Sequence, residues 1–318
     1  MASIFAGVDL GGTKIQTAVL KTKRVIGSDR VPTPQTGASD VIAVIASSIA
    51  KALEGADVTL AELTAVGVGT PGTIDPSGSV SNSPNVPGFE VGPVALGREL
   101  SKALDGVKVL VDNDVRVAVR GEWKRGAGRP FRNFMGVFAG TGVGGGIVIN
   151  GQLIEGNGGA GEIGHTLVRD RGRLCGCGLK GHMEAYAGRK MIETEARRLQ
   201  SRGHKTVLFD IMKDRGRDRV TSGVIAAALK QHDKVTTKLI DEAVWALGIA
   251  LSNVQNLLDL EAIIVGGGLG DRLGKPFVER VASAAQPRLH VPDHPPKFLT
   301  TELGDLAGAV GAAVLAGG

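Results

Sequence analysis

The two cysteines of this chain lie one residue apart, in the stretch LCGCGLKGHMEAYAG. His182 follows Cys175 and Cys177 by a few residues, and His165 precedes Cys175 by ten. Thiolate and imidazole groups are the usual ligands of a tetrahedral Zn²⁺. A redox pair is a weaker interpretation, because a CxC arrangement forms a strained ring and the chain has no Cys-x-x-Cys. A third interpretation is that both cysteines are small buried residues of a glycine-rich turn and that His182 is exposed.

A second polar group follows an apolar run in VLVDNDVRVAV, where Asp112, Asn113 and Asp114 stand together. The ends of strands are where α/β proteins place their chemistry. A carboxylate at such a position can accept the proton of an attacking hydroxyl, as phosphoryl transfer to an alcohol requires. The alternative interpretation of the cluster is an ordinary surface turn.

Glycine accounts for 48 of the 318 residues and gathers at three places, near residues 11, 140 and 266. Clustered glycines let the backbone approach a ligand closely, and successive N–H groups in such turns can bind phosphate. Thr13 and Thr141 would add hydroxyl contacts, and Lys14 a positive charge, although Lys14 is also compatible with a solvated surface lysine. Taken alone, each loop also fits a plain hairpin turn. The third loop, VGGGLGD, fits either adenine contact or close helix packing.

The second loop contains a literal GxGxxG at Gly140, Gly142 and Gly145. A dinucleotide fingerprint needs a helix directly after it, so that the helix N-terminus faces the pyrophosphate. Here the β-branched, strand-like GIVINGQLI follows, and the chain has no GxxxxGK[ST] motif. Phosphate contacts from a hairpin are therefore favoured over dinucleotide binding.

The elements that must position these residues are those of an α/β protein. The opening SIFAGVDLGGTKIQTAVLKT predicts strand, tight glycine turn and strand, and residues 40–56 predict a helix. Placing Gly7 on Gly136 aligns GVDLGGTKIQTAVL with GVFAGTGVGGGIVI, which is an internal repeat of one supersecondary unit. The repeat predicts two related α/β halves that each offer a glycine hairpin to one ligand. Residues beyond about 182 are mostly helical in pattern, apart from a strand in EAIIVGGGLGD.

Length and composition narrow the class of protein. A chain of 318 residues is too long for one typical domain, so two domains are expected. The net charge of +5 and the scarcity of aromatic residues give little support to nucleic-acid binding. Two cysteines so close in sequence are not a secreted disulfide framework, and the sequence shows neither a signal peptide nor an apolar run of membrane-spanning length. We therefore expect a cytoplasmic protein without a membrane or nucleic-acid partner.

Eight motifs, taken in their order along the chain, resemble the ROK family of bacterial sugar kinases and repressors, and the resemblance covers nearly the whole sequence. They are GVDLGGTKIQTAVL, GTPGTID, PNVPGF, DND, AGTGVGGGIVINGQL, GGAGEIGH, CGCGLKGHME and IIVGGGLGD. The chain is most similar to the glucokinases of that family. The resemblance implies a two-domain α/β fold of the actin/hexokinase-like (ribonuclease H-like) type, with ATP and sugar meeting in an interdomain cleft. Residues 1–114 and about 303–318 would form the smaller domain, and residues 115–302 the larger one.

The resemblance also implies roles for particular residues. Asp114 would be the base that takes the proton from the 6-hydroxyl of the hexose, and Asp9 would help to hold Mg²⁺. The ATP phosphates would lie against Gly11, Gly12, Thr13, Lys14, Gly140, Thr141 and Gly142, and the adenosine against Gly266, Gly267 and Gly268. The sugar hydroxyls would be bound by Asn85, Asn113, Asp114, Glu162, His165 and Glu184. Carboxylates and amides suit a sugar, because each hydroxyl both donates and accepts hydrogen bonds.

Two departures from the family pattern stand out. Zinc-containing ROK proteins hold the metal with the His of the GH motif and three cysteines of CxCGxxGC, and here His182 stands where the third cysteine belongs. The resemblance therefore implies a structural Zn²⁺ on His165, Cys175, Cys177 and His182, which would order the loop that carries the sugar ligands. The second departure is NDVR, in which Arg116 replaces the second Asn of the usual Asn-Asp-Ala-Asn.

Several functional alternatives remain open at this stage. The same scaffold could phosphorylate mannose, fructose or N-acetylmannosamine, and polyphosphate is a less favoured phosphate donor. A non-catalytic sugar sensor is a further alternative, against which Asp9, Asp114 and both phosphate loops argue. ROK repressors carry a helix-turn-helix domain ahead of the first glycine hairpin, which begins here by residue 7, so a DNA-binding regulator is not expected. Family resemblance also suggests a homodimer or a homotetramer.

Overall fold

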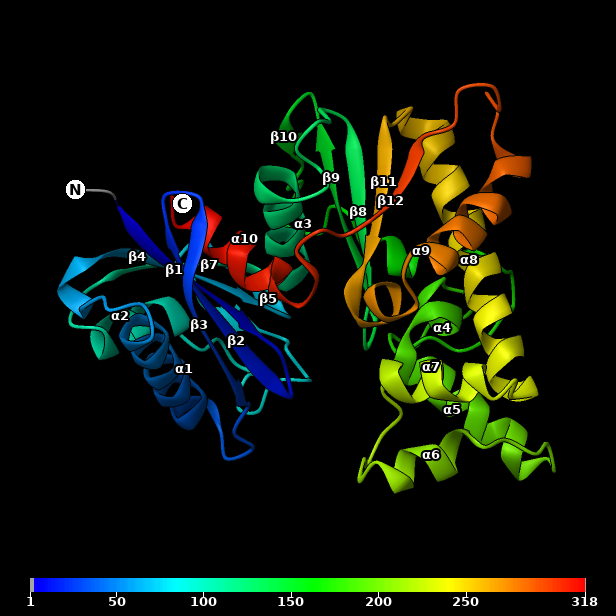
Figure 1. Cartoon of the computed structure of the whole chain (residues 1–318), viewed down its shortest axis with the longest axis horizontal. Helices are drawn as coiled ribbons and strands as arrows, with labels where there is room; N and C mark the ends of the chain where they lie inside the picture. Colours follow the sequence, from blue (N-terminus) through cyan, green and yellow to red (C-terminus); the bar gives the residue numbers. More distant parts are fainter. Residues whose placement is uncertain (1–2, 318) are drawn as a thin grey trace. The chain divides into compact units, whose positions relative to one another are not determined.

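The structure, a computed structural model, describes residues 3–317, and the chain divides into two compact units. Unit 1 takes the chain up to Pro130, the short segment Glu155–Gly158, and the chain from Glu302 onward. Unit 2 takes Phe131–Ile154 and Gly159–Thr301. The beginning and the end of the chain, blue and red in Figure 1, thus belong to the same unit. The mixed α/β organisation expected from the sequence is confirmed.

Unit 1 is built on a five-stranded sheet with the order β3-β2-β1-β4-β7. Its strands are β1 (Ile4–Leu10), β2 (Lys14–Lys21), β3 (Arg24–Pro32), β4 (Leu63–Thr70) and β7 (Lys108–Asn113). The first three are antiparallel neighbours, whereas β1, β4 and β7 run parallel. A small hairpin of β5 (Thr73–Ile74) and β6 (Val80–Ser81) stands apart from this sheet. The parallel strands bring their carboxyl ends to one edge, which is where ligands bind in α/β folds.

Both faces of this sheet are covered, because successive side chains of a strand point to opposite sides. One face packs on α1 (Ala38–Glu54) and α2 (Leu96–Ala103), and the other on α3 (Asp114–Arg125) and α10 (Ala307–Leu315). Ile4 and Val8 of β1 point to the first core, and Phe5 to the second. Single 3₁₀ turns precede β4 (η1, Leu60–Glu62) and α10 (η4, Gly304–Leu306).

The predicted domain boundary after Asp114 differs from this division, because α3 belongs with unit 1. Helix α3 lies directly against α10, and the approach is so close that a Cβ on Gly311 would stand 1.6 Å from the carbonyl oxygen of Val117. The partner helix of α3 comes from the far end of the chain, so its position could not be read from sequence order. The boundary therefore falls after Pro130 rather than at the start of α3.

Unit 2 repeats the design with a sheet of the order β10-β9-β8-β11-β12. Its strands are β8 (Phe134–Ala139), β9 (Val143–Ile149), β10 (Gln152–Leu153), β11 (Ala262–Gly266) and β12 (Lys297–Thr300). The hairpin β8-β9 corresponds to β1-β2, and each hairpin has a parallel strand beside its first member. The second turn is one residue tighter, because Ala139 pairs with Val143 whereas Leu10 pairs with Ile15. The internal repeat expected from the sequence is thus present as a structural repeat.

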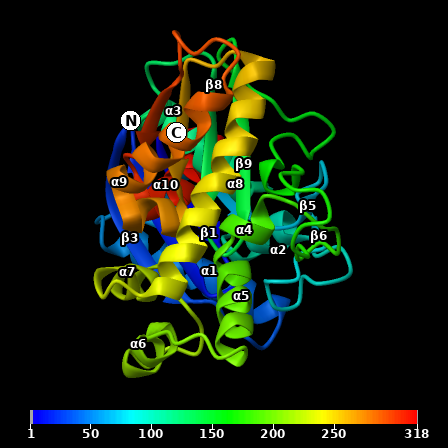
Figure 2. The same cartoon turned by 90° about the vertical axis from the view of Figure 1, so that its right-hand side faces the viewer.

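The helices of unit 2 form its large apolar core against this sheet. They are α4 (Glu184–Ala187), α5 (Arg189–Ser201), α6 (Leu208–Asp214), α7 (Ser222–Lys230), α8 (Lys234–Leu258) and α9 (Gly267–Ala285), with 3₁₀ turns η2 (Ile163–His165) and η3 (Gln286–Arg288). The long helix α8 runs beside α9, as Figures 1 and 2 both show. Helix α9 is interrupted at Gly274, just before Pro276. Among residues 3–317, no helix combines the length and the apolar character that crossing a membrane would need.

Candidate functional site

The carboxyl edge of the sheet in unit 1 gathers several of the predicted residues. Asp9 pairs in register with Gly69, and Gly69 pairs with Asp112, so the carboxylates of β1 and β7 end at the same edge. Asn113 closes β7, and Asp114 begins α3. Asn85 joins the first glycine turn, because a Cβ on Gly12 would stand 1.9 Å from the carbonyl oxygen of Asn85.

Asp9 is a half-buried carboxylate in an unusual electrostatic setting. Burial is the main reason that its pKa is raised to about 6; the charge of Lys14 lowers the pKa and that of Asp305 raises it. The Nζ of Lys14 lies 3.6 Å from a carboxylate oxygen of Asp305. Gly308 of α10 packs on Asp9, and a Cβ there would be 2.7 Å from the carboxylate carbon. A carboxylate whose burial disfavours its charge is stabilised when a cation binds to it.

Asn113 and Asp114 are oriented by the start of α3. The Oδ1 of Asn113 accepts hydrogen bonds from the backbone N–H groups of Val115 and Arg116, at 3.0 and 3.2 Å. This is an N-cap, in which a side chain satisfies backbone donors that have no partner within the helix. Capping occupies the oxygen of Asn113 and leaves its amide nitrogen to donate to a ligand. Asp114 follows in the first turn, where its Oδ1 accepts from the N–H of Val115 at 3.0 Å.

In unit 2, the second glycine turn is held by the start of α5. The N–H of Gly140 donates to the carbonyl of Gly142 at 2.9 Å, while the N–H groups of Arg189 and Lys190 donate to Gly140 and Thr141 at 3.1 Å. The guanidinium of Arg189 donates to the hydroxyl of Thr141 at 2.7 Å. Burial and the charge of Arg219 lower the pKa of Arg189.

Arg189 is not among the site residues predicted from the sequence. The signal that identifies it is spatial, because 48 residues separate it from Thr141. A cation beside a glycine turn is suited to binding an anion there.

Glu184 connects this turn with the cysteine stretch. One carboxylate oxygen accepts from the N–H of Val143 at 2.9 Å, and the other lies 3.4 Å from the Sγ of Cys175. Gly142 packs against this side chain, since a Cβ there would be 2.3 Å from the carboxylate. The predicted sugar ligand Glu184 is therefore also a support for the glycine turn.

Glu162 precedes the 3₁₀ turn η2, and His165 is its last residue. The Nε2 of His165 lies 4.0 Å from a carboxylate oxygen of Glu162, and both side chains are well exposed. The turn packs closely on β9, because a Cβ on Gly164 would be 2.1 Å from the carbonyl oxygen of Val143.

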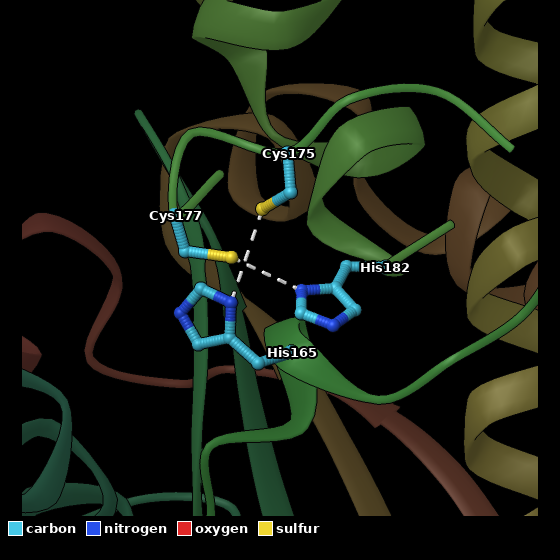
Figure 3. A group of neighbouring side chains, drawn as sticks. All are labelled: His165, Cys175, Cys177 and His182. Atoms are coloured by element: carbon cyan, nitrogen blue, oxygen red, sulfur yellow. Dashed lines mark hydrogen bonds between the residues drawn. The ribbon is translucent and has the colours of Figure 1, made fainter. Parts of the chain in front are cut away.

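The two cysteines and two histidines come together as the sequence predicted (Figure 3). Their potential ligand atoms all lie within 4.8 Å of one another. The Nδ1 of His165 is 3.9 Å from the Sγ of Cys175, and the Nδ1 of His182 is 3.2 Å from the Sγ of Cys177. Both cysteines are free thiols, so the redox-pair interpretation gains nothing from the structure.

These four residues fit a tetrahedral zinc ion. Bond lengths of about 2.3 Å to sulfur and about 2.0 Å to nitrogen require ligand atoms roughly 3.3–3.8 Å apart. The cluster reaches 4.8 Å at most, so a small movement closes it. Burial raises the pKa of the Cys175 thiol to about 12, and a bound divalent cation would reverse this by stabilising the thiolate. The Nδ1 of His165 faces the cluster and its Nε2 faces Glu162. This orientation would let Nδ1 bind the metal while Nε2 donates to a sugar hydroxyl.

In the third glycine loop, close packing leaves no room for a side chain at two of the three glycines. A Cβ on Gly266 would stand 2.2 Å from the Thr301 side chain, and one on Gly267 would stand 2.8 Å from the backbone of Ala139. A Cβ on Gly268 would meet the hydroxyl of Ser222 at 3.1 Å. Close packing therefore explains the first two glycines, and adenosine contact stays a prediction for this loop.

The whole chain is similar to known sugar kinases. The sequence profile of the ROK family matches residues 5–318. A glucokinase from Halalkalibacterium halodurans is 34% identical over 318 residues, covering 96% of this chain and 93% of the relative. An N-acetylmannosamine kinase from Vibrio cholerae is 31% identical over 292 residues, covering 91% and 92%.

The fold of this chain is similar to that of a solved ROK family structure. The crystal structure of a ROK family glucokinase from Streptomyces griseus in complex with glucose and AMPPNP is similar with a TM-score of 0.83 at 32% identity, and 99% of each chain is covered. The chain described here therefore belongs to the ROK family and has the two-domain, actin-like α/β fold of the ROK sugar kinases.

Proposed function

We propose that this protein is an ATP-dependent hexose kinase that prefers glucose and transfers the γ-phosphate to the sugar 6-hydroxyl. The observation that carries the proposal is the carboxyl edge of unit 1, where Asp9 precedes the first glycine turn and pairs with Gly69, and Asp114 lies against the same Gly69. Glucokinases among the relatives support glucose as the acceptor. Phosphoryl transfer relies on positioning, metal-ion electrostatics and one proton acceptor, and this edge supplies residue types for each.

In this proposal Asp114 accepts the proton of the 6-hydroxyl as the oxygen attacks phosphorus. Its position in the first turn of α3, with one oxygen bonded to the N–H of Val115, restricts its orientation. General-base catalysis depends on such a fixed acceptor within hydrogen-bond reach of the substrate. Asn113 then donates to a neighbouring sugar hydroxyl through its amide nitrogen.

The phosphates and Mg²⁺ are assigned to the glycine turns and Asp9. Backbone N–H groups of Gly11 and Gly12, with Thr13 and Lys14, and of Gly140, Thr141 and Gly142 would contact the phosphate oxygens. Mg²⁺, when bound with ATP, neutralises the charge that develops on the phosphates. Arg189 is added to the sequence-based set, because its guanidinium already contacts the second turn. Gly266, Gly267 and Gly268 are retained for adenosine.

Asn85, Glu162, His165 and Glu184 are assigned to the remaining sugar hydroxyls. A site built to bond particular hydroxyls discriminates against a sugar that lacks or misplaces one, because a buried polar group is then left without a partner. The kinase from Vibrio cholerae named above makes N-acetylmannosamine the second candidate acceptor.

We further propose that His165, Cys175, Cys177 and His182 hold a structural Zn²⁺. A closed four-ligand site leaves no open position for catalysis. Its effect on the sugar site is to orient His165, because coordination of one imidazole nitrogen makes the other a donor of fixed direction. A homodimer or homotetramer, expected from the family, is the assembly we propose.

A coupled ADP-release assay over a panel of hexoses tests the main proposal, with Asp114→Asn as the control. Glucose is expected to give the highest kcat/KM, and the variant is expected to lose at least about a hundredfold in kcat, as removal of a general base does. Calorimetric binding of the same sugars to Asp114→Asn shows that the variant is folded. Binding of a hexose by the wild type without turnover on any sugar would make the protein a sensor rather than a kinase.

A further inference from the structure

Arg116, which departs from the family pattern, contacts both a buried carboxylate and a distant backbone carbonyl at the edge of unit 1. Its Nε and Nη2 donate to one carboxylate oxygen of Asp112, at 2.7 and 2.5 Å. Asp112 is only 7% exposed, and the Arg116 side chain is 12% exposed. A carboxylate buried at a strand end needs such partners, because an unpaired buried charge is strongly unfavourable.

The remaining nitrogen of the same guanidinium reaches a distant segment. The Nη1 of Arg116 donates to the carbonyl oxygen of Gly158 at 2.9 Å. Arg120, one turn further along α3, lies 3.8 Å from Asp112 and 3.8 Å from Glu155. The segment Glu155–Gly158 is therefore held against α3 and counts as part of unit 1, although its neighbours on both sides belong to unit 2.

We propose that Arg116 is a positioning residue for the sugar site, because it fixes the start of the loop that carries Glu162. Only three residues, Gly159 to Gly161, separate Gly158 from Glu162, so the anchored carbonyl limits Glu162 to about 14 Å from it. The same helix that Arg116 holds in place begins with Asp114. Arg116 thus links the helix that begins with Asp114, the predicted base, to the loop that carries Glu162, a predicted sugar ligand. This inference rests on the proposed function.

The glycines around the anchor explain why a side chain must hold it. Gly156, Gly158 and Gly161 all have positive φ, at 56°, 95° and 90°. Glycine loses more conformational freedom on folding than any other residue, so this loop has little intrinsic order. An arginine suits the task better than lysine or asparagine, because its planar fork bonds a carboxylate and a carbonyl at the same time.

Kinetics of Arg116→Gln and Arg116→Lys test the proposal. The KM for the hexose is expected to rise roughly tenfold, which is the size of effect expected for losing a hydrogen bond to a charged group. The KM for ATP is expected to stay within about twofold of wild type. Arg116→Lys keeps a positive charge near Asp112, so its melting temperature is expected to equal that of wild type. Its KM for the hexose is nevertheless expected to rise. Arg197→Gln is the matched control, since it removes another i,i+4 ion pair, with Glu193 on α5.

Hydrogen exchange gives a readout that does not depend on kinase activity. Amides of residues 153–165 are expected to exchange faster in both Arg116 variants than in wild type or Arg197→Gln. Gly158→Ala should reproduce this effect because φ is +95° there, whereas Gly159→Ala, with open space around it and an ordinary φ, should not.

The outcomes separate the two proposals. Unchanged exchange in the Arg116 variants overturns the anchoring, and faster exchange with an unchanged hexose KM overturns the positioning role. A wild type that phosphorylates no hexose defeats the proposed function instead. In that case the exchange data decide the anchoring alone, and calorimetric hexose affinity replaces KM as the test of positioning.

Discussion

Asp9 carries the clearest conflict between stability and function among the single side chains. Its pKa is raised to about 6 by burial, so above that pH the folded protein holds a charge that its surroundings disfavour. The folded state binds the proton more tightly than the unfolded state, whose carboxyl keeps a pKa near 3.8. Stability from this group is therefore full below about pH 4 and is lost as pH rises through about 6.

Asp9→Asn is accordingly expected to be more stable than wild type at pH 8, by on the order of 1–2 kcal/mol. The difference should shrink toward pH 4.5, because the wild-type carboxyl is then largely protonated. Thermal unfolding of both proteins across this pH range measures it. The same variant should lose kinase activity, because it lacks the carboxylate proposed for Mg²⁺. A stability difference that is larger at pH 4.5 than at pH 8 would contradict the assignment.

His182 is the second side chain whose role can be isolated. Wild type is expected to contain close to one zinc per chain. His182→Ala is expected to contain clearly less, because the three remaining ligands bind the metal more weakly than four do. His182→Cys restores the CxCGxxGC arrangement and should restore the metal. Elemental analysis of the purified proteins gives the result. Equal zinc in wild type and His182→Ala would remove His182 from the site.

Among the elements, the pair α3 and α10 shows how small residues decide packing. Replacing a helical glycine by alanine normally favours the helix by about 1 kcal/mol. At Gly311 the added methyl would meet the backbone of Val117 at 1.6 Å, and backbone cannot move aside as a flexible side chain can. Overpacking of this kind costs about 1–3 kcal/mol, so the packing effect should outweigh the propensity.

Gly311→Ala is therefore expected to lower the melting temperature and to impair activity, since α3 carries Asp114 at its first position. Gly97→Ala in α2 is the matched control, because its nearest neighbours would stand 3.5 Å away. Differential scanning calorimetry of the two variants compares them directly. A Gly311→Ala protein as stable as wild type would show that the helices can separate without cost.

At the scale of the whole molecule, one buried carboxylate joins α3 to the segment near the end of the chain that returns to unit 1. Glu122 of α3 is 1% exposed and accepts hydrogen bonds from the N–H groups of Ala127, Glu302 and Leu303. Two of these donors lie 180 and 181 residues further along the chain. The sequence offers no signal for this contact, because a glutamate in a helix is most often a solvated surface residue.

Local patterns were enough to predict much of the fold. The glycine hairpins, the helix near residues 40–56 and the repeat of two supersecondary units all depend on periodicity and turn residues close together in sequence. The gathering of His165, Cys175, Cys177 and His182 was also predictable, since family spacing and a short loop constrain them. The GxGxxG stretch entered a strand, as its β-branched residues indicated.

The sequence by itself thus determined the family, the α/β class and the residues proposed to bind phosphate, sugar and metal. Only the tertiary structure decided that α3 belongs with α10, that Arg189 contacts the second glycine turn, and that Arg116 reaches Gly158. These contacts join residues that lie far apart along the chain. Their partners are chosen by shape and by the need to satisfy buried charges, and neither leaves a periodic trace in a single sequence.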